Sequence, residues 1–198
     1  MTLLDRQIRE PLFEFLEETC GRVRIMEEKQ IGRSRADVMM VTETGLYGIE
    51  IKSDADSYTR LRRQVKDYDR YYDFNILAVG TRHAVHCADH IPSWWGIITV
   101  EREGNRIDCY MMRKPSLNPK VKLSDQLTLL WRPELASVQK RLNLPRYKEK
   151  SKRFVQQKLL EKTEPDELKR EIRNALFERD YTLIGEEIGA FRRGEKRD

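Results

Sequence analysis

Three residues of this chain, Asp37, Glu50 and Lys52, have the types and spacing to do chemistry. Glu50 and Lys52 are two positions apart, so on a strand they share one face, while Ile49 and Ile51 point the other way. Carboxylates are the ligands that Mg²⁺ prefers, and an amine beside them can orient water or neutralise charge. Such a group could catalyse metal-assisted hydrolysis. The alternative is a surface ion cluster in which Lys52 only pairs with the carboxylates.

A hairpin must position these side chains. Residues 39–42 and 47–51 are rich in strand formers, and the Thr-Gly pair at 44–45 offers the positive φ that a two-residue loop requires. With that loop, Asp37 lies opposite Lys52 and shares its face. All three side chains then converge at the end of the sheet farthest from the turn.

The elements around the hairpin follow from apolar periodicity and from residues that break helices. Pro11 should kink the first helix or delay its start, and Gly21 should end it. Asp54 or Asp56 can cap the helix that follows the hairpin. The other predicted elements are a helix over 3–19, a strand over 23–30, a helix ending near 72, a strand over 75–80, a short helix over 83–90, and strands over 95–100 and 106–112.

The order of these elements predicts an α/β fold. A strand, a helix and another strand between residues 46 and 80 imply a right-handed crossover and a parallel pair. A mixed β-sheet with helices on both faces follows. Past residue 114 strand patterning stops, so we expect a core over 1–114 and a C-terminal all-helical extension over 115–198.

Helices in this extension are predicted near 134–143, 151–162, 165–179 and 182–192. Leu135 to Leu144, followed by Lys150 to Leu160, resembles the SAP-type helix-loop-helix modules that bind DNA, so the extension could bind nucleic acid or a protein partner. The alternative is a small helical bundle that closes over the sheet.

The composition is that of a soluble protein of ordinary domain size. Its 198 residues are 36% charged and 39% hydrophobic, and no run of eighteen apolar residues suggests a membrane span. Cys20, Cys87 and Cys109 are scattered without zinc-site spacing, so a reducing, cytoplasmic location is expected. A net charge of +5 is compatible with a polyanionic partner.

The pattern D-x12-E-I-K at residues 37–52, which follows one predicted helix and precedes another, resembles the PD-(D/E)XK nuclease superfamily. The wider stretch RADV…GIEIKSDAD…RLRRQVKDYDRYYDFNILAVGTRHA…IPSWWGII is similar to a small bacterial and phage branch of it, over about residues 3–100. Ala36 stands where the superfamily name has a proline. The resemblance implies a restriction-endonuclease-like core and a metal-dependent nuclease that hydrolyses phosphodiester bonds, with DNA the favoured substrate.

The resemblance also implies roles for single residues. Asp37 and Glu50 would hold Mg²⁺ or Mn²⁺ together with the carbonyl of Ile51, and Lys52 would orient or deprotonate water and neutralise phosphate charge. Related nucleases often carry a polar residue where Gln64 stands, one helical turn beyond Arg60.

Acidic and basic residues nearby are further candidates. An additional acid often completes such sites, and the candidates here are Glu10 on the first helix and Glu28 on the first strand, each with the alternative of an ordinary solvated charge. Four arginines near the motif could contact backbone phosphates, or could be ordinary surface charge. They are Arg33, Arg35, Arg60 and Arg63.

Two other functions compete with an autonomous nuclease. One is a catalytically silent nucleic-acid-binding or protein-interaction module of the same fold. The other is a nuclease subunit that is active only with a partner, because the sequence carries no helicase, ATP-binding or methyltransferase motif. A homodimer or a larger complex stays open.

Overall fold

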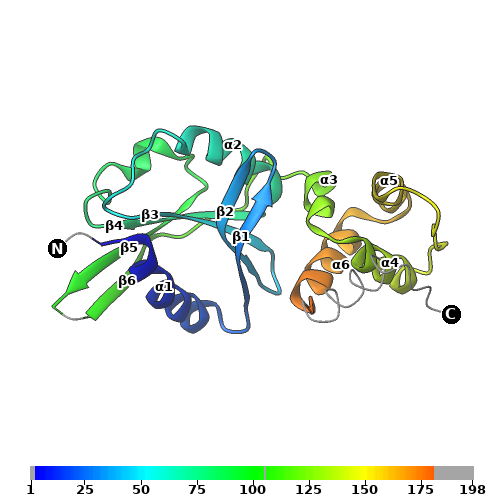
Figure 1. Cartoon of the computed structure of the whole chain (residues 1–198), viewed down its shortest axis with the longest axis horizontal. Helices are drawn as coiled ribbons and strands as arrows, with labels where there is room; N and C mark the ends of the chain where they lie inside the picture. The colour runs from blue at the N-terminus through cyan, green and yellow to red at the C-terminus, as the bar shows by residue number, and fades with distance from the viewer. Residues whose placement is uncertain (1–2, 105, 181–198) are drawn as a thin grey trace, which may run out of the picture. The chain divides into compact units, whose positions relative to one another are not determined.

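The structure, a computed structural model, describes residues 3–104 and 106–180 (Figure 1). The chain divides into two compact units, Met1–Leu129 and Leu130–Asp198, which we call the sheet unit and the helical unit. This division lies later than the predicted boundary at 114/115. Residues just past that boundary still bond to the sheet unit, because the Asn118 side chain donates to the carbonyls of Asp69 (2.8 Å) and Tyr72 (2.7 Å).

Within the described residues, six strands form one mixed sheet in the order β1-β2-β3-β4-β5-β6. The pairs β3–β4 and β4–β5 are parallel and the other three are antiparallel. The predicted α/β class, with a mixed sheet flanked by helices and a helical C-terminal part, is confirmed. The strands are β1 (Arg24–Ile31), β2 (Ser34–Val41), β3 (Leu46–Lys52), β4 (Phe74–Gly80), β5 (Gly96–Glu103) and β6 (Arg106–Arg113).

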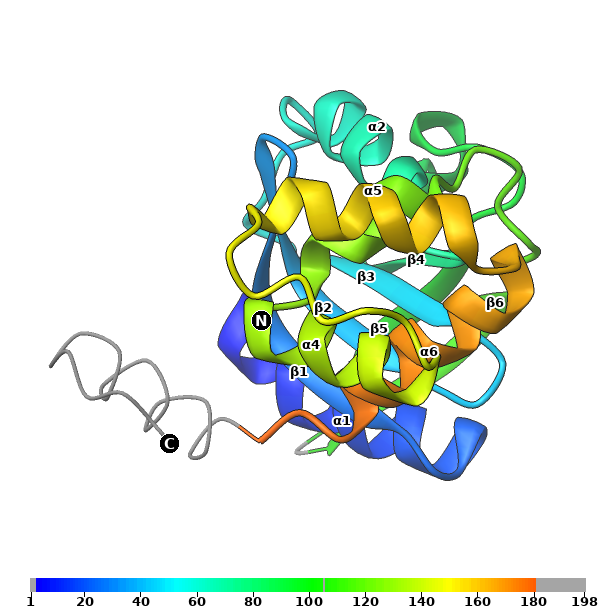
Figure 2. The same ribbon diagram turned by 90° about the vertical axis from the view of Figure 1, so that its right-hand side faces the viewer.

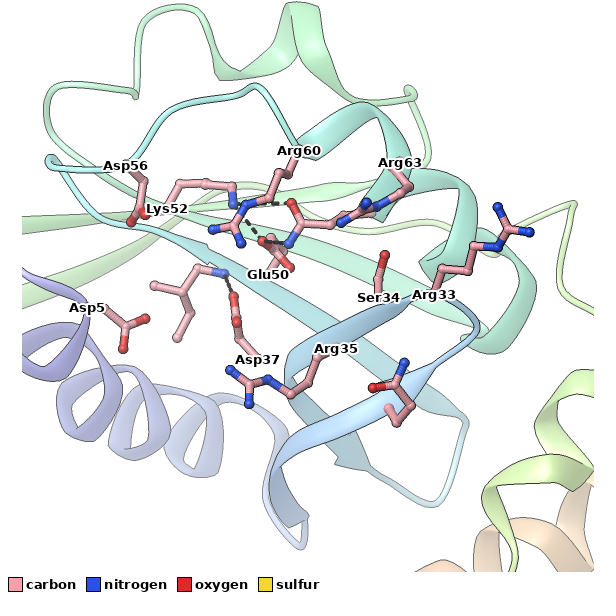
Figure 3. A pocket seen from close by; sticks show the side chains of 13 residues that line it. Asp5, Arg33, Ser34, Arg35, Asp37, Glu50, Lys52, Asp56, Arg60 and Arg63 are labelled. Atoms are coloured by element: carbon pink, nitrogen blue, oxygen red, sulfur yellow. Dashed lines mark hydrogen bonds and ion pairs between the residues drawn. The ribbon is translucent and has the colours of Figure 1, made fainter.

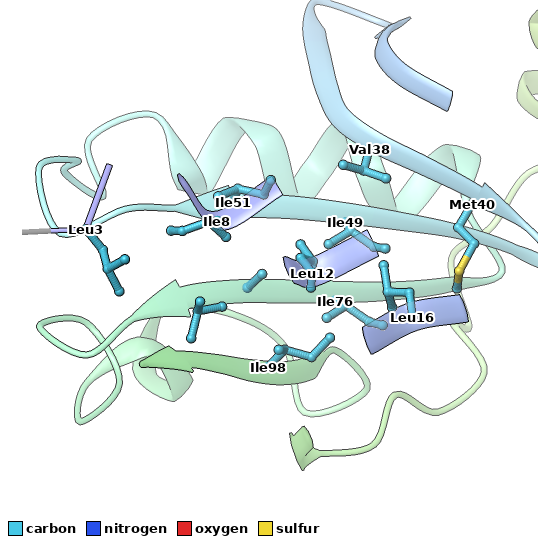
Figure 4. Close-up of a cluster of buried hydrophobic side chains, with 12 residues drawn as sticks. Leu3, Ile8, Leu12, Leu16, Val38, Met40, Ile49, Ile51, Ile76 and Ile98 are labelled. Carbon is cyan, nitrogen blue, oxygen red and sulfur yellow. The ribbon is translucent and has the colours of Figure 1, made fainter. Parts of the chain in front are cut away.

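Helices α1 (Asp5–Cys20) and α2 (Leu61–Tyr71) lie on opposite faces of this sheet (Figure 1). The buried side of α1 packs on alternate strand residues such as Ile49 and Ile51 (Figure 4). Because successive side chains of a strand point to opposite faces, Glu50 must point toward α2. The side chains that form the α1 cluster include Ile8, Leu12, Leu16, Val38, Met40, Ile76 and Ile98.

On the other face, α2 lies close to the sheet at Gly48. A Cβ atom at Gly48 would lie 2.1 Å from the Tyr72 ring and 2.7 Å from the Tyr68 ring, far inside van der Waals contact. Glycine is therefore what allows the helix to approach β3 this closely.

The hairpin that carries the motif differs from the prediction in its turn and register. Val41 pairs with Leu46, so four residues form the turn, and the Thr42 hydroxyl accepts hydrogen bonds from the amides of Thr44 and Gly45, both at 3.1 Å. Extension of this register places Asp37 beside Glu50 rather than opposite Lys52, still on the same face. Gly45 does not have the predicted positive φ.

Three predicted helices also differ at their ends. The first helix runs from Asp5 through Pro11, so the proline does not delay it, and Gly21 ends it with a φ of 71°. The helix after the hairpin begins only at Leu61, because the Asp54 and Asp56 carboxylates bond to other backbone amides instead of capping it. The predicted helix over 83–90 is reduced to the short 3₁₀ helix η1 (Cys87–His90).

The described part of the helical unit is built on three helices whose apolar residues pack together. Their buried side chains include Leu135 of α4, Leu159 of α5 and Ile172 of α6. The predicted helix over 182–192 lies outside the described residues. The three helices of the helical unit are α4 (Arg132–Arg141), α5 (Lys152–Lys162) and α6 (Pro165–Phe177). The short helices α3 (Leu123–Gln126) and η2 (Leu127–Leu129) end the sheet unit. In the described part of the chain, no helix has the length and apolar character needed to span a membrane.

Candidate active site

A cavity of about 450 Å³ lies in the sheet unit, lined by residues of α1, β1, β2, β3, α2 and the loops next to them (Figure 3). Most residues predicted for the site line it. Those residues are Arg33, Arg35, Asp37, Glu50, Ile51, Lys52, Arg60, Arg63 and Gln64.

Glu50 is the centre of the hydrogen-bond network. Its Oε1 accepts from Lys52 Nζ (2.7 Å) and from the Gln64 side-chain amide, and its Oε2 accepts from the Tyr68 hydroxyl (2.7 Å). A carboxylate offers about four lone-pair positions. The three donors therefore leave Glu50 room for one more contact, on Oε2.

Asp37 lies beside Glu50 and is held by the backbone of β3. The amide of Ile51 donates to its Oδ2 at 2.8 Å. Burial, and then the negative charge of Glu50, raise the pKa of Asp37 to about 7, against the opposing effects of the Ile51 amide and Lys52. A pKa this far above the usual aspartate range reflects burial first and the neighbouring carboxylate of Glu50 second.

Lys52 is buried, contrary to the alternative of a surface ion cluster. Glu50 is 1% exposed and Lys52 is 3% exposed, and the Lys52 ammonium also donates to Gln64 Oε1 at 3.3 Å. Burying two charges costs desolvation energy, so a buried pair is weak evidence for a stabilising role. This pair borders the cavity, where it could contact a bound ion or ligand.

Tyr68 is a site residue that the sequence did not reveal. Its hydroxyl lies 2.7 Å from Glu50 Oε2 and 3.2 Å from the Ile49 carbonyl, and it accepts from the Asp37 amide at 3.1 Å. Burial and the nearby carboxylates raise its pKa well above the ordinary tyrosine value, so the hydroxyl stays protonated as a donor. Its place in the apolar stripe of α2 suggested only core packing, although it follows Gln64 by one helical turn.

The further acids that line the cavity are Asp5 and Asp56, not the predicted ones. Glu10 is exposed and lies outside the cavity lining. Glu28 points into ion pairs with Arg9 (2.9 Å) and Arg35 (2.5 Å). The sequence feature that could have pointed to Asp5 as a site residue is its place in the first turn of the first helix.

The turn between β1 and β2 brings Arg33 and Arg35 to the cavity rim (Figure 3). It is fixed to α2, since the Ser34 hydroxyl donates to Asp67 at 2.6 Å and the Gly32 amide donates to the Tyr71 hydroxyl at 3.1 Å. Gly32 has a φ of 54°, and a Cβ there would lie 2.7 Å from the Asp67 carboxylate.

Comparison with solved structures finds Pyrococcus furiosus SfsA in complex with Ca²⁺, with a TM-score of 0.36 and 13% identity. The match covers 59% of this chain and 63% of that one, so the chain spans less than two thirds of SfsA's length. No curated protein matches the sequence.

Comparison with protein families is more informative. Residues 2–185, nearly the whole length, match one family, described as bacteriophage P4 protein cII. A match over both the sheet unit and most of the helical unit covers far more than half of the sequence. The chain belongs to the bacteriophage P4 protein cII family.

Proposed function

We propose that the protein is a metal-dependent nuclease that hydrolyses phosphodiester bonds of DNA, with its active site in the cavity of the sheet unit. One observation carries the proposal. Two adjacent carboxylates and a buried lysine converge on a cavity whose rim is formed by arginines. The resemblance of D-x12-E-I-K to the PD-(D/E)XK pattern also supports a metal-dependent nuclease. Membership of that superfamily is part of the proposal.

The donor set fits a hard divalent cation. Mg²⁺ favours carboxylate, carbonyl and water oxygens and usually takes only one or two carboxylates from a protein. Asp37 and Glu50 would supply these, with the Ile51 carbonyl as a third ligand. Among the described residues, no group of three or more His, Cys, Asp or Glu side chains is arranged to hold a metal, so water would complete the shell. A bound Mg²⁺ or Mn²⁺ would act as a Lewis acid toward the scissile phosphate.

Lys52 would act on the attacking water or on the phosphate. Its ammonium is fixed by Glu50 at 2.7 Å and by Gln64 at 3.3 Å, with two acceptors for three protons. The remaining N–H can donate to a phosphate oxygen or hold a water molecule in line for attack. Gln64 orients both Lys52 and Glu50, and Tyr68 fixes the second oxygen of Glu50.

The arginines would hold the substrate. The cavity is lined by Arg63 of α2 and by Arg60 directly before it. It is also lined by Arg33 of the β1–β2 turn and by Arg35 of β2, which pairs with Glu28. Contacts from such groups to backbone phosphates position a nucleic acid without reading its sequence.

The test is cleavage of circular and linear DNA with Mg²⁺, with Mn²⁺ and with EDTA. We expect cation-dependent cleavage by the wild type, and Lys52→Ala should lower the rate by at least about 100-fold, as expected for loss of a group that acts on the reacting water. Lys114→Ala, at an exposed position outside the cavity, is the control for loss of one positive charge. A Lys52→Ala protein that cuts at the wild-type rate would refute the role of Lys52.

The same assay separates the competing functions. A wild-type protein that binds DNA but does not cut it under any of these conditions would favour the catalytically silent module. Cleavage that appears only when a host or phage extract is added would favour a subunit of a larger nuclease.

A further inference from the structure

The helical unit contains a second large cavity, a groove of about 810 Å³. Its lining residues belong to α4 and to the loop at 142–151. Figure 2 shows this loop leading from α4 into α5. The residues that line it come from Arg132 to Lys148, and none of them is acidic. We call it the basic groove.

The loop that forms one wall of the basic groove is fixed in place. The Gln139 side chain donates to the Pro145 carbonyl at 2.6 Å, and the Arg132 guanidinium donates to the carbonyls of Tyr147 (2.6 Å) and Lys150 (3.1 Å). Asn143, with a φ of 53°, ends α4 in the left-handed conformation. The groove is therefore a preformed shape, which lowers the entropy cost of binding.

Three cations of the groove are available to a ligand. Lys140, Arg146 and Lys148 are exposed, and within residues 3–104 and 106–180 none of them has an ion pair with a carboxylate. Two acids of this unit, Glu134 and Glu171, pair with Arg179 and Arg141, and the exposed Glu149 beside Lys148 does not line the groove. The groove lining is thus positively charged, and no carboxylate of the described residues pairs with these three cations.

We propose that the basic groove binds the sugar-phosphate backbone of nucleic acid, as a second contact for the substrate of the proposed nuclease. The inference rests on the proposed function for the choice of polyanion. Ala136, Leu144 and Tyr147 line the groove beside the cations. A wall that carries both apolar and cationic groups suits a chain of sugars, bases and phosphates better than it suits free phosphate.

The test is fluorescence anisotropy of the full chain with a labelled DNA duplex and with a single strand of the same sequence, in EDTA, over a salt series. The triple variant Lys140→Gln, Arg146→Gln, Lys148→Gln should bind at least about tenfold more weakly near 0.1 M salt, with a log–log salt slope shallower by about 2 to 3, because each lost phosphate contact removes about 0.9 from the slope for a duplex.

A matched control has the same change of charge on the same unit. Lys158→Gln, Lys162→Gln, Lys169→Gln removes three lysines that lie outside the groove, and it should keep the wild-type affinity and slope. Equal binding by both triple variants would overturn the proposal. Displacement of the DNA by polyglutamate as effectively as by unlabelled DNA would overturn nucleic acid as the ligand.

Binding is measured without a divalent cation, so it does not depend on catalysis. A wild-type protein whose DNA affinity falls in the groove variant, but which never cuts DNA, supports the groove and refutes only the nuclease.

Discussion

Replacing Asp37 by asparagine should change how the stability of the metal-free protein depends on pH. Burial and Glu50 raise the pKa of Asp37 to about 7 in the folded protein, whereas an unperturbed aspartate titrates near about 3.9. The folded state therefore binds this proton more tightly than the unfolded chain. Between pH values of about 4 and about 7, the free energy of unfolding should fall as the pH rises, and above about 7 this loss is complete.

The magnitude follows from the difference between the two pKa values. A gap of about 3 corresponds to about 4 kcal/mol, at about 1.36 kcal/mol for each pKa unit, as an upper bound. From pH 5 to pH 8 only the part near the folded pKa is sampled, so the wild type should lose about 2 to 3 kcal/mol relative to Asp37→Asn. The asparagine side chain keeps an oxygen that can accept from the Ile51 amide.

The assay is urea unfolding of both proteins in EDTA at several pH values from 5 to 8. The difference in free energy of unfolding between them removes the titration of groups that do not interact with Asp37. Asp108→Asn, at an exposed position on β6, is the control for the loss of one surface charge. A difference between wild type and Asp37→Asn that is independent of pH would refute the argument that burial and Glu50 raise the pKa of Asp37.

Two further predictions concern α2. Tyr68→Phe should lower the free energy of unfolding by about 2 kcal/mol and should weaken cation binding, because Glu50 loses a charge-assisted hydrogen bond. Tyr72→Phe is the control measured beside it by urea unfolding and cation titration: the Tyr72 hydroxyl is buried without a hydrogen-bond partner in the described structure, so its loss should cost nothing. Arg60→Gln with Arg63→Gln should weaken binding to all DNA sequences alike and reduce the salt slope by up to about 2. Unchanged salt dependence in filter binding would show that these arginines are ordinary surface charge.

Much of the sheet unit could be predicted because its signals are local. Alternation at Ile49, Glu50, Ile51 and Lys52 assigns one set of side chains to the core and the other to the site. The strand–helix–strand order then predicts a parallel pair of strands independently of the loop conformations. Strands β3 and β4 form that pair.

The errors lie where distant residues decide a local structure. Asp54 was expected to cap a helix, but its carboxylate accepts from the amides of Leu3 (2.9 Å) and Arg82 (3.0 Å), and neither partner is visible from the local sequence. The hairpin turn is longer than predicted because the Thr42 hydroxyl satisfies two amides within it.

The candidate site was predictable in type but not in its supporting contacts. The spacing of Asp37, Glu50 and Lys52 was sufficient to propose a shared face. That Lys52 is buried, and that Tyr68 bonds to Glu50, depends on how close α2 lies to β3, which no pattern in the sequence specifies.

That close approach makes the site vulnerable at a residue that no substrate would touch. Because a side chain at Gly48 would collide with the rings of Tyr68 and Tyr72, any other residue there must push α2 away from β3. The hydrogen bonds from α2 to Glu50 would then lengthen together. A related protein could retain Asp37, Glu50 and Lys52 and still lack the proposed nuclease activity. The motif alone would therefore be insufficient to predict the proposed activity in a related protein, and the residue between Tyr47 and Ile49 has to be considered with it.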